Sequence, residues 1–136
     1  MPPLPRRWIA IGALLGAIGV ALGAYGAHGL TGFLEKLGHT GDDLHHRLAI
    51  FETAVRYQMF HALALCFTGL AMQQRESPWW RFAAWAFLLG VILFSGLLKV
   101  LTFADPQWNW LGAIVPIGGL SMILGWLALA IGALKK

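Results

Sequence analysis

Apolar residues of this 136-residue chain fall into four long blocks separated by more polar stretches. The first block has no charged residue and is about as long as a helix that crosses a bilayer. Its basic start also fits a signal peptide, but its length favours a helix that is retained. Another block becomes fully apolar only after His61, so we expect its helix to begin near Glu52. The blocks predict spanning helices over about 8–27, 52–72, 82–101 and 110–134.

A longer polar stretch, residues 28–51, separates the first two predicted helices and is expected to form an outer loop. Its second half begins with Asp42 or Asp43, either of which suits a helix N-cap. An apolar stripe then recurs every three or four residues and comprises Leu44, Leu48, Phe51, Val55 and Met59. We therefore expect an amphipathic segment that either projects from the membrane or bends to lie on its surface.

The composition supports a membrane protein, since 58% of the residues are hydrophobic and 12% are charged. A soluble domain of this length could not bury so much apolar surface. The single cysteine excludes an internal disulfide framework. Although the net charge is +4, the basic residues flank the apolar blocks instead of forming a patch interleaved with aromatic residues, so we expect no nucleic-acid partner.

The distribution of basic residues predicts the orientation of the chain. Six of them lie at the two termini and in the 73–81 loop, namely Arg6, Arg7, Arg75, Arg81, Lys135 and Lys136. Because positive charge is enriched in cytoplasmic segments, both termini should face the cytoplasm, with an even number of spans. Six tryptophans fall mostly at predicted helix ends, as in an aromatic belt: Trp8, Trp79, Trp80, Trp108, Trp110 and Trp126.

Glycine is abundant in the predicted spans, with 17 glycines in the chain. In the first span they are Gly12, Gly16, Gly19 and Gly23, at spacings of three and four residues. Such a stripe lets helices approach closely in lipid, and a flexible pore-lining helix is the alternative. In the last span, Pro116 is followed by Gly118 and Gly119, which predicts a kink. A broken helix that forms a binding site is the alternative there.

Polar residues are concentrated at the head of the second predicted span. Glu52 and Arg56 stand four residues apart and can pair on one helix face, while Tyr57 and His61 share another. The group is either an interfacial ion pair that fixes the depth of the helix or a site for a ligand or a proton. Lys99, which closes the third span, is a candidate partner for Glu52.

Motifs for metal binding and catalysis are missing from the sequence. We expect His61 to donate a hydrogen bond to a neighbouring helix, with a haem or metal role as the lesser alternative. A histidine- and aspartate-rich group lies nearby, but its spacing matches no metal site, so we expect no metal ion or other cofactor; it comprises His39, Asp42, Asp43, His45 and His46. There is no phosphate-binding loop, dinucleotide fingerprint or nucleophile motif, and we expect a protein that is not an enzyme.

Four stretches together resemble one known family. They are GAYGAHGL (Gly23–Leu30), TAVRYQMFHALAL (Thr53–Leu65), LFSG (Leu93–Gly96), and PIGG (Pro116–Gly119) with GW (Gly125–Trp126). In this order they are similar to the small membrane proteins of domain of unknown function 423. The resemblance covers nearly the whole chain and implies a compact four-helix membrane protein, but it implies no reaction. The chain departs from the family pattern after FSG, where it reads LLKVL.

The sequence therefore predicts one transmembrane domain over residues 1–136, an all-α integral membrane four-helix bundle in the cell inner membrane. We expect one polar pocket formed by His28, Glu52, Arg56, Tyr57, Gln58, His61 and Ser95. The favoured function is a non-catalytic accessory protein that binds lipid, a partner membrane protein or a second copy of itself. The alternative is a small transporter, channel or proton-linked carrier that uses Glu52, Arg56 and His61.

Overall fold

Helices make up almost all of the computed structural model, which describes residues 3–135. In chain order they are α1 (Leu4–His28), α2 (Leu30–Lys36), α3 (Gly41–Gln74), α4 (Pro78–Gly90), the π-helix η1 (Val91–Gly96), α5 (Leu97–Phe103), the 3-10 helix η2 (Pro106–Ala113) and α6 (Val115–Leu134). No strand is present in this range. The predicted all-α class is confirmed.

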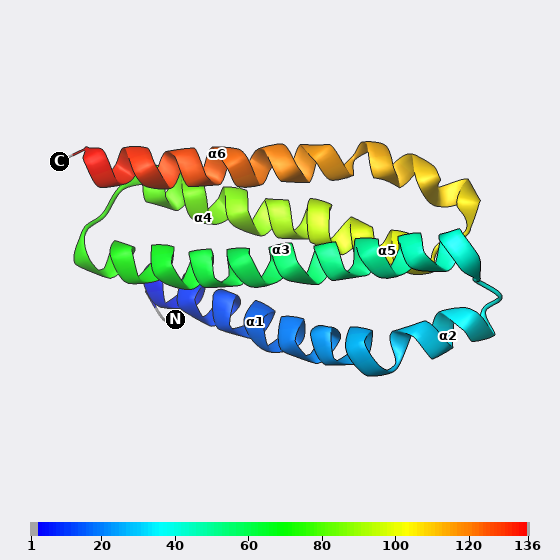
Figure 1. The fold of residues 1–136 in the computed structure, drawn as a ribbon. Helices are drawn as coiled ribbons and strands as arrows, with labels where there is room; N and C mark the ends of the chain where they lie inside the picture. Colours follow the sequence, from blue (N-terminus) through cyan, green and yellow to red (C-terminus); the bar gives the residue numbers. More distant parts are fainter. Residues whose placement is uncertain (1–2, 136) are drawn as a thin grey trace.

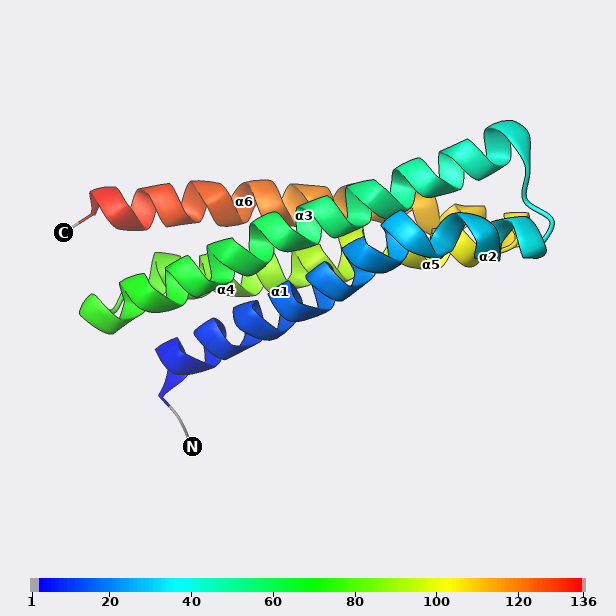
Figure 2. The same cartoon turned by 60° about the horizontal axis from the view of Figure 1, so that its bottom comes forward.

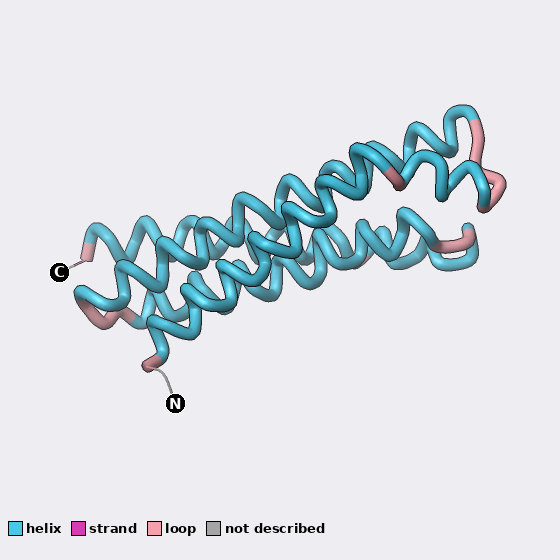
Figure 3. The backbone as a smooth tube through the Cα atoms, turned by 90° about the horizontal axis from the view of Figure 1, so that it is seen from below, coloured by secondary structure: helices cyan, strands magenta, loops and turns pink. Residues whose placement is uncertain are grey.

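The helices lie lengthwise beside one another, with the connecting segments at the two ends of the molecule (Figures 1 and 3). Both termini lie at one end, called here the termini end, and α2 lies at the other, called the α2 end (Figure 1). α3 packs mainly against α1, and α4 packs mainly against α6. Figure 2 shows α3 running across the molecule beside the other helices.

Three segments among the described residues are long and apolar enough to cross a membrane. They are Leu4–His28, the continuous helix Pro78–Phe103 formed by α4, η1 and α5, and Pro106–Leu134 formed by η2 and α6. α3 is not among them. It carries the charged and polar residues that interrupt the second apolar block, and these lower its mean hydropathy.

α3 begins earlier than the expected start near Glu52, because the amphipathic segment continues it without a break from Gly41. Its N-cap is Thr40 instead of Asp42 or Asp43, and both aspartates lie in the first turn. The early turns stay helical because their apolar stripe is covered: Leu44 and Phe51 pack with residues of α2 in a second hydrophobic cluster. At 1.5 Å per residue, α3 is about 50 Å long.

Pro116 does not lie within a continuing α-helix, so the expected mid-helix kink is absent. It stands in the first turn of α6, directly after the 3-10 segment η2. A proline is favoured there because the first-turn N–H groups have no partner within the helix. The change from 3-10 to α geometry takes the place of the kink.

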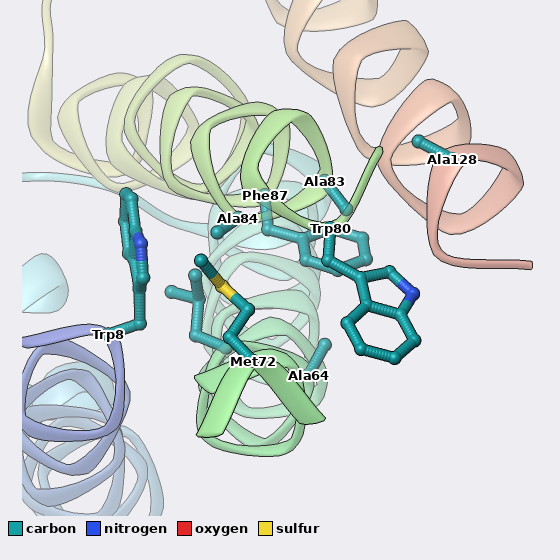
Figure 4. Packing of buried hydrophobic residues seen from close by; sticks show 9 residues of the cluster. Trp8, Ala64, Met72, Trp80, Ala83, Ala84, Phe87 and Ala128 are labelled. Atoms are coloured by element: carbon teal, nitrogen blue, oxygen red, sulfur yellow. The ribbon is translucent and has the colours of Figure 1, made fainter. Parts of the chain in front are cut away.

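The main hydrophobic cluster joins helices distant in sequence at the termini end (Figure 4). Trp8 of α1, Leu65 of α3 and Phe87 of α4 are each almost inaccessible. The small residues Ala83, Ala84 and Ala128 leave room for these larger side chains. The apolar blocks thus pack on one another along one face each and leave their other faces exposed to the surroundings.

Glycines allow several helix pairs to approach backbone to backbone. A Cβ added at Gly12 would lie 2.6 Å from the Ala62 carbonyl oxygen of α3, and one at Gly118 would lie 2.5 Å from the Phe94 nitrogen of η1. At Gly19 the added atom would meet the Met59 side chain. By contrast, a Cβ at Gly16 would meet nothing within 4 Å, and those at Gly23 and Gly119 would make ordinary contacts.

Two arginines cap helix C-termini at opposite ends of the molecule. At the α2 end, buried Arg47 donates to the carbonyls of Thr102 and Ala104, each at 2.9 Å, and pairs with Asp43. At the termini end, Arg75 donates to carbonyls at the end of α6 and lies over the Trp80 ring. Cations are favoured at these positions because helix C-termini carry partial negative charge.

The glycine contacts predict opposite effects for two neighbouring substitutions in α1. Gly12→Ala should destabilise the protein by about 1–3 kcal/mol, because its Cβ would clash with the α3 backbone. Gly16→Ala should be neutral or stabilising by up to about 1 kcal/mol, since it fills open space and favours the helix. Thermal unfolding in detergent micelles measures both. Equal midpoints for the two variants would contradict the packing described here.

The cap on α5 predicts that Arg47→Gln costs about 2–4 kcal/mol of unfolding free energy, because several charge-assisted hydrogen bonds are lost. Arg56→Gln is the matched control, since it breaks an exposed pair worth no more than about 1 kcal/mol. Denaturation in mixed micelles compares the two. If Arg56→Gln proved the more harmful change, the structural role given to Arg47 would be wrong.

Candidate functional site

α3 lies against α1 on one side and against the α4–α6 part of the molecule on another. Its polar side chains therefore point to different neighbours according to their angle around the helix. The residues expected to form one polar pocket are found in several places.

Glu52 and Arg56 form an ion pair, as their spacing suggested, with side chains 70% and 55% exposed. Both line a groove of about 440 Å³ between α1 and α3, together with small residues that include Gly23 and Gly26. Since each charge already has a partner and most of each side chain is accessible, the pair resembles an interfacial ion pair more closely than a buried charge site.

Gln58 is buried between three helices, with 1% of its surface exposed. Its amide nitrogen donates to the Leu15 carbonyl of α1 at 2.8 Å, and its amide oxygen accepts a hydrogen bond from the Lys99 ammonium of α5. The suggested pairing of Lys99 with Glu52 is therefore wrong, because Glu52 pairs with Arg56 on its own helix. Gln58 connects α1, α3 and α5 through one side chain.

His61 is buried and uses both ring nitrogens. Nδ1 lies 2.7 Å from the Tyr57 carbonyl oxygen, and Nε2 lies 3.1 Å from the indole nitrogen of Trp126 on α6. An indole N–H can only donate, so Nε2 accepts and Nδ1 carries the proton. His61 thus receives a hydrogen bond from the neighbouring helix instead of donating one, which corrects the expectation. This is the neutral form of the ring, with both nitrogens paired.

A groove between α3 and α6 opens beside this hydrogen bond. It has a volume of about 570 Å³. Its lining is mostly aromatic and aliphatic and consists of Tyr57, Phe60, His61, Leu63, Ala64, Phe67, Trp126 and Leu129. From Tyr57 to Phe67 it extends about 15 Å along α3 at 1.5 Å per residue. The walls carry no ionised side chain at neutral pH.

The other expected pocket residues lie around this groove or away from it. The Tyr57 ring stands at the groove end nearer α2, 4.9 Å from the Phe94 ring of η1. Ser95, next to Phe94, is fully buried and its hydroxyl has no hydrogen-bond partner in the described chain. His28 is exposed at the end of α1 and lines neither groove. The structure brings Tyr57 and His61 together and leaves His28 apart.

Three important residues were not assigned these roles from the sequence. Trp126, placed among the belt tryptophans, lies within α6 and holds His61. Lys99 bonds to Gln58, and Arg47 caps α5. Only the four-residue spacing of Asp43 and Arg47 offered a local signal, because the other contacts join residues far apart in the chain.

The histidine- and aspartate-rich segment forms an ion-pair cluster at the α2 end. Partial desolvation acts to raise the pKa of Asp43, but hydrogen bonds and charges from His39 and Arg47 outweigh it, so the pKa is lowered. Among residues 3–135, no three histidine, cysteine, aspartate or glutamate side chains converge to hold a metal ion. His39 Nδ1 lies 2.7 Å from Asp43 Oδ2 and belongs to this cluster.

Comparison with known proteins places the chain in a family. Residues 22–119 match the family model described as "Protein of unknown function (DUF423)". No solved structure matches the chain. The match covers the groove residues of α3 and the η1 segment but ends before Trp126.

Curated relatives match over almost their whole length. UPF0382 membrane protein SH2409 of Staphylococcus haemolyticus is 41% identical over 96% of this chain and 97% of its own. A Haemophilus influenzae UPF0382 membrane protein is 35% identical over 98% of both chains. UPF0382 inner membrane protein YgdD of Escherichia coli is 34% identical over 96% and 91%. With these relatives and its apolar helices, the chain is a multi-pass protein of the inner membrane and belongs to the DUF423 family of membrane proteins of unknown function.

Proposed function

We propose that this protein is a non-catalytic, four-span protein of the inner membrane that holds the apolar chain of a lipid in the groove between α3 and α6. The observation that carries the proposal is the groove itself. It is long, lined by aromatic and aliphatic side chains, and the polar groups of His61 and Trp126 in its wall are already paired with each other.

α3 serves as the fourth span in this proposal. Its polar groups at membrane depth have partners on neighbouring helices, which removes most of the cost of placing them in lipid. Its residues before Glu52 then project beyond the hydrocarbon core. Arg6, Arg75 and Arg81 lie at the termini end, which supports a cytoplasmic position for both termini. Lys136, also counted in that prediction, lies outside the described residues.

The size of the lining residues favours a lipid chain over a partner helix. Helices in membranes associate where small residues permit close backbone approach. The groove presents Phe60, Phe67 and Trp126, and Ala64 is its one small residue. A flexible acyl chain can follow such an uneven surface, whereas a helix backbone would be held away from it. The Tyr57 hydroxyl, which has no hydrogen-bond partner in the described chain, stands where a lipid ester could accept its proton.

The carrier alternative has less support from the geometry. Its proposed groups are divided, since Glu52 and Arg56 line the groove against α1 while His61 lines the groove against α6. Most glycines with close contacts face other helices of the same chain, so they serve the packing of this chain and do not line a carrier pore. Lipid binding relies on neither arrangement.

The topology is testable with two single-cysteine variants in a Cys66→Ala background. Lys36→Cys lies near the α2 end and Gln74→Cys at the other end of α3, and both positions are exposed. In intact spheroplasts, a membrane-impermeant maleimide should label Lys36→Cys at once and Gln74→Cys only after permeabilisation. Labelling of both positions from the same side would show that α3 does not span.

The groove is testable with a matched pair of leucines. Leu63 lines it and is 66% exposed, while Leu14 of α1 is 65% exposed and lies outside it. Leu63→Asn places an amide among apolar groups, so the retention of phospholipid measured by native mass spectrometry should fall about tenfold. Leu14→Asn should retain lipid as the wild type does.

Equal retention by wild type and Leu63→Asn would exclude the groove as the lipid site. Ion or proton flux through proteoliposomes that disappears in His61→Ala would favour the carrier alternative instead.

A further inference from the structure

Lys99 is a cation directed into the molecule, toward the bilayer interior. It lies on α5, near the end of the long helix Pro78–Phe103 that runs from the termini end to the α2 end. Side chains on a helix lean toward its N-terminus, which here means away from the α2 end. A lysine that reached for the nearer membrane surface would point the opposite way. Instead, the ammonium bonds to Gln58.

The contact with Gln58 places the charge well below the membrane surface. Gln58 lies six residues further along α3 than Glu52, which corresponds to about 9 Å at 1.5 Å per residue. Gln58 is almost fully buried, while Lys99 is partly exposed. Lys99 is therefore half-buried, with its ammonium bonded to a buried amide.

No carboxylate of the described chain neutralises this charge. Asp43 and Glu52 pair with arginines on α3, and Glu76 pairs with Arg81 at the termini end. The remaining acids are exposed residues at or near the α2 end: Glu35, Asp42 and Asp105. The hydrogen-bond partner of Lys99 is the neutral amide of Gln58. Charges at membrane depth are costly and almost always pair with other polar groups, so a carboxylate partner would be strongly favoured.

Lys99 also stands where another helix can reach it. α1 packs on α3 and makes no extended contact with α4, η1 or α5. The two sides meet through the rings of Trp8 and Trp85 near one end, and α2 and α5 meet through Phe33 and Phe103 near the other. We call the surface between these two ring contacts, where Gln58 of α3 bonds to both α1 and α5, the Lys99 seam.

One turn before Lys99, the backbone is open to close approach. A Cβ added at Gly96 would meet only the Val91 carbonyl oxygen, at 3.7 Å. A small residue beside a polar group is the combination by which membrane helices associate, since the backbones come close and the polar group is satisfied between them. Gly96 and Lys99 provide both features on one face of the seam.

We propose that the Lys99 seam binds a transmembrane helix of another protein that carries an aspartate or glutamate within its span. A second copy of this chain is a poorer occupant, because a parallel copy presents no carboxylate at the level of Gln58. A lipid phosphate stays at the headgroup level, above that depth. The seam is separate from the α3–α6 groove, so this binding does not depend on the lipid site.

The test uses the full-length protein in phosphatidylcholine vesicles with synthetic leucine-rich transmembrane peptides. One peptide carries a single glutamate 9 Å below its outer end, and its control carries leucine there. Energy transfer between labelled protein and labelled peptide should give a dissociation constant about tenfold lower for the glutamate peptide. Lys99→Gln, whose amide can still donate to Gln58, should abolish this preference, and Lys99→Arg should keep it.

A second variant covers the case in which Lys99→Gln does not fold. Gln58→Glu supplies a carboxylate to Lys99 from within the chain, so it should remove the preference for the glutamate peptide. Arg56→Gln, which alters an exposed charge nearby, should leave the preference unchanged.

Three results would overturn the proposal. One is equal affinity of the wild type for the two peptides. Another is a glutamate preference that persists in Lys99→Gln or Gln58→Glu. The third is a Lys99-dependent association with a different occupant, seen either as energy transfer between two copies of the protein or as retention of phosphatidylglycerol without any peptide preference.

Discussion

The polar groups of α3 need hydrogen-bond partners, because this helix is packed among other helices and, as the proposed fourth span, would be surrounded by lipid instead of water. Gln58 meets this need through α1 and α5, and His61 meets it through Trp126 of α6. Arg47 donates hydrogen bonds to the carbonyls at the end of α5, which would otherwise lack donors. Each contact requires one rotation of α3 about its axis, so together they fix how the other helices are arranged around it.

Close backbone approach is the second constraint, and it acts most strongly between α6 and η1. Gly118 packs against the backbone at Phe94, and the Ser121 hydroxyl donates to the Ala86 carbonyl at 2.8 Å. η1 is a π-helix, in which the hydrogen-bonding step is one residue longer than in an α-helix. This local change rotates the residues after it, and Lys99 of α5 then faces Gln58 on α3.

These constraints leave two surfaces of opposite chemistry. The α3–α6 groove is uncharged and lined by large rings, which suits a flexible apolar chain. The Lys99 seam holds a cation next to the open backbone at Gly96, which suits a helix that carries an acidic residue. The groove lies between α3 and α6, whereas the seam lies where α3 meets α1 and α5. The two proposals therefore concern separate surfaces and do not exclude each other.

Much of the architecture follows from the sequence because it depends on local spacing. The apolar blocks gave the all-α class and the approximate positions of three apolar spans, and four-residue spacing gave the Glu52–Arg56 pair. The extent of α3 was not evident, because its first turns are stabilised by packing on α2, a contact outside the segment itself. The position of Pro116 depended likewise on whether the preceding residues adopt 3-10 or α geometry.

The sites depended on contacts between residues far apart in the chain. His61 stands 65 positions before Trp126, and Gln58 stands 41 before Lys99. No periodicity within one helix encodes such pairs, since they arise from the rotation and depth of each helix against the others. The sequence by itself determined that the chain is a membrane protein and which polar residues its apolar segments contain. Only the tertiary structure decided which of them meet, because a polar group in lipid is stabilised by the partner that packing places within hydrogen-bond distance.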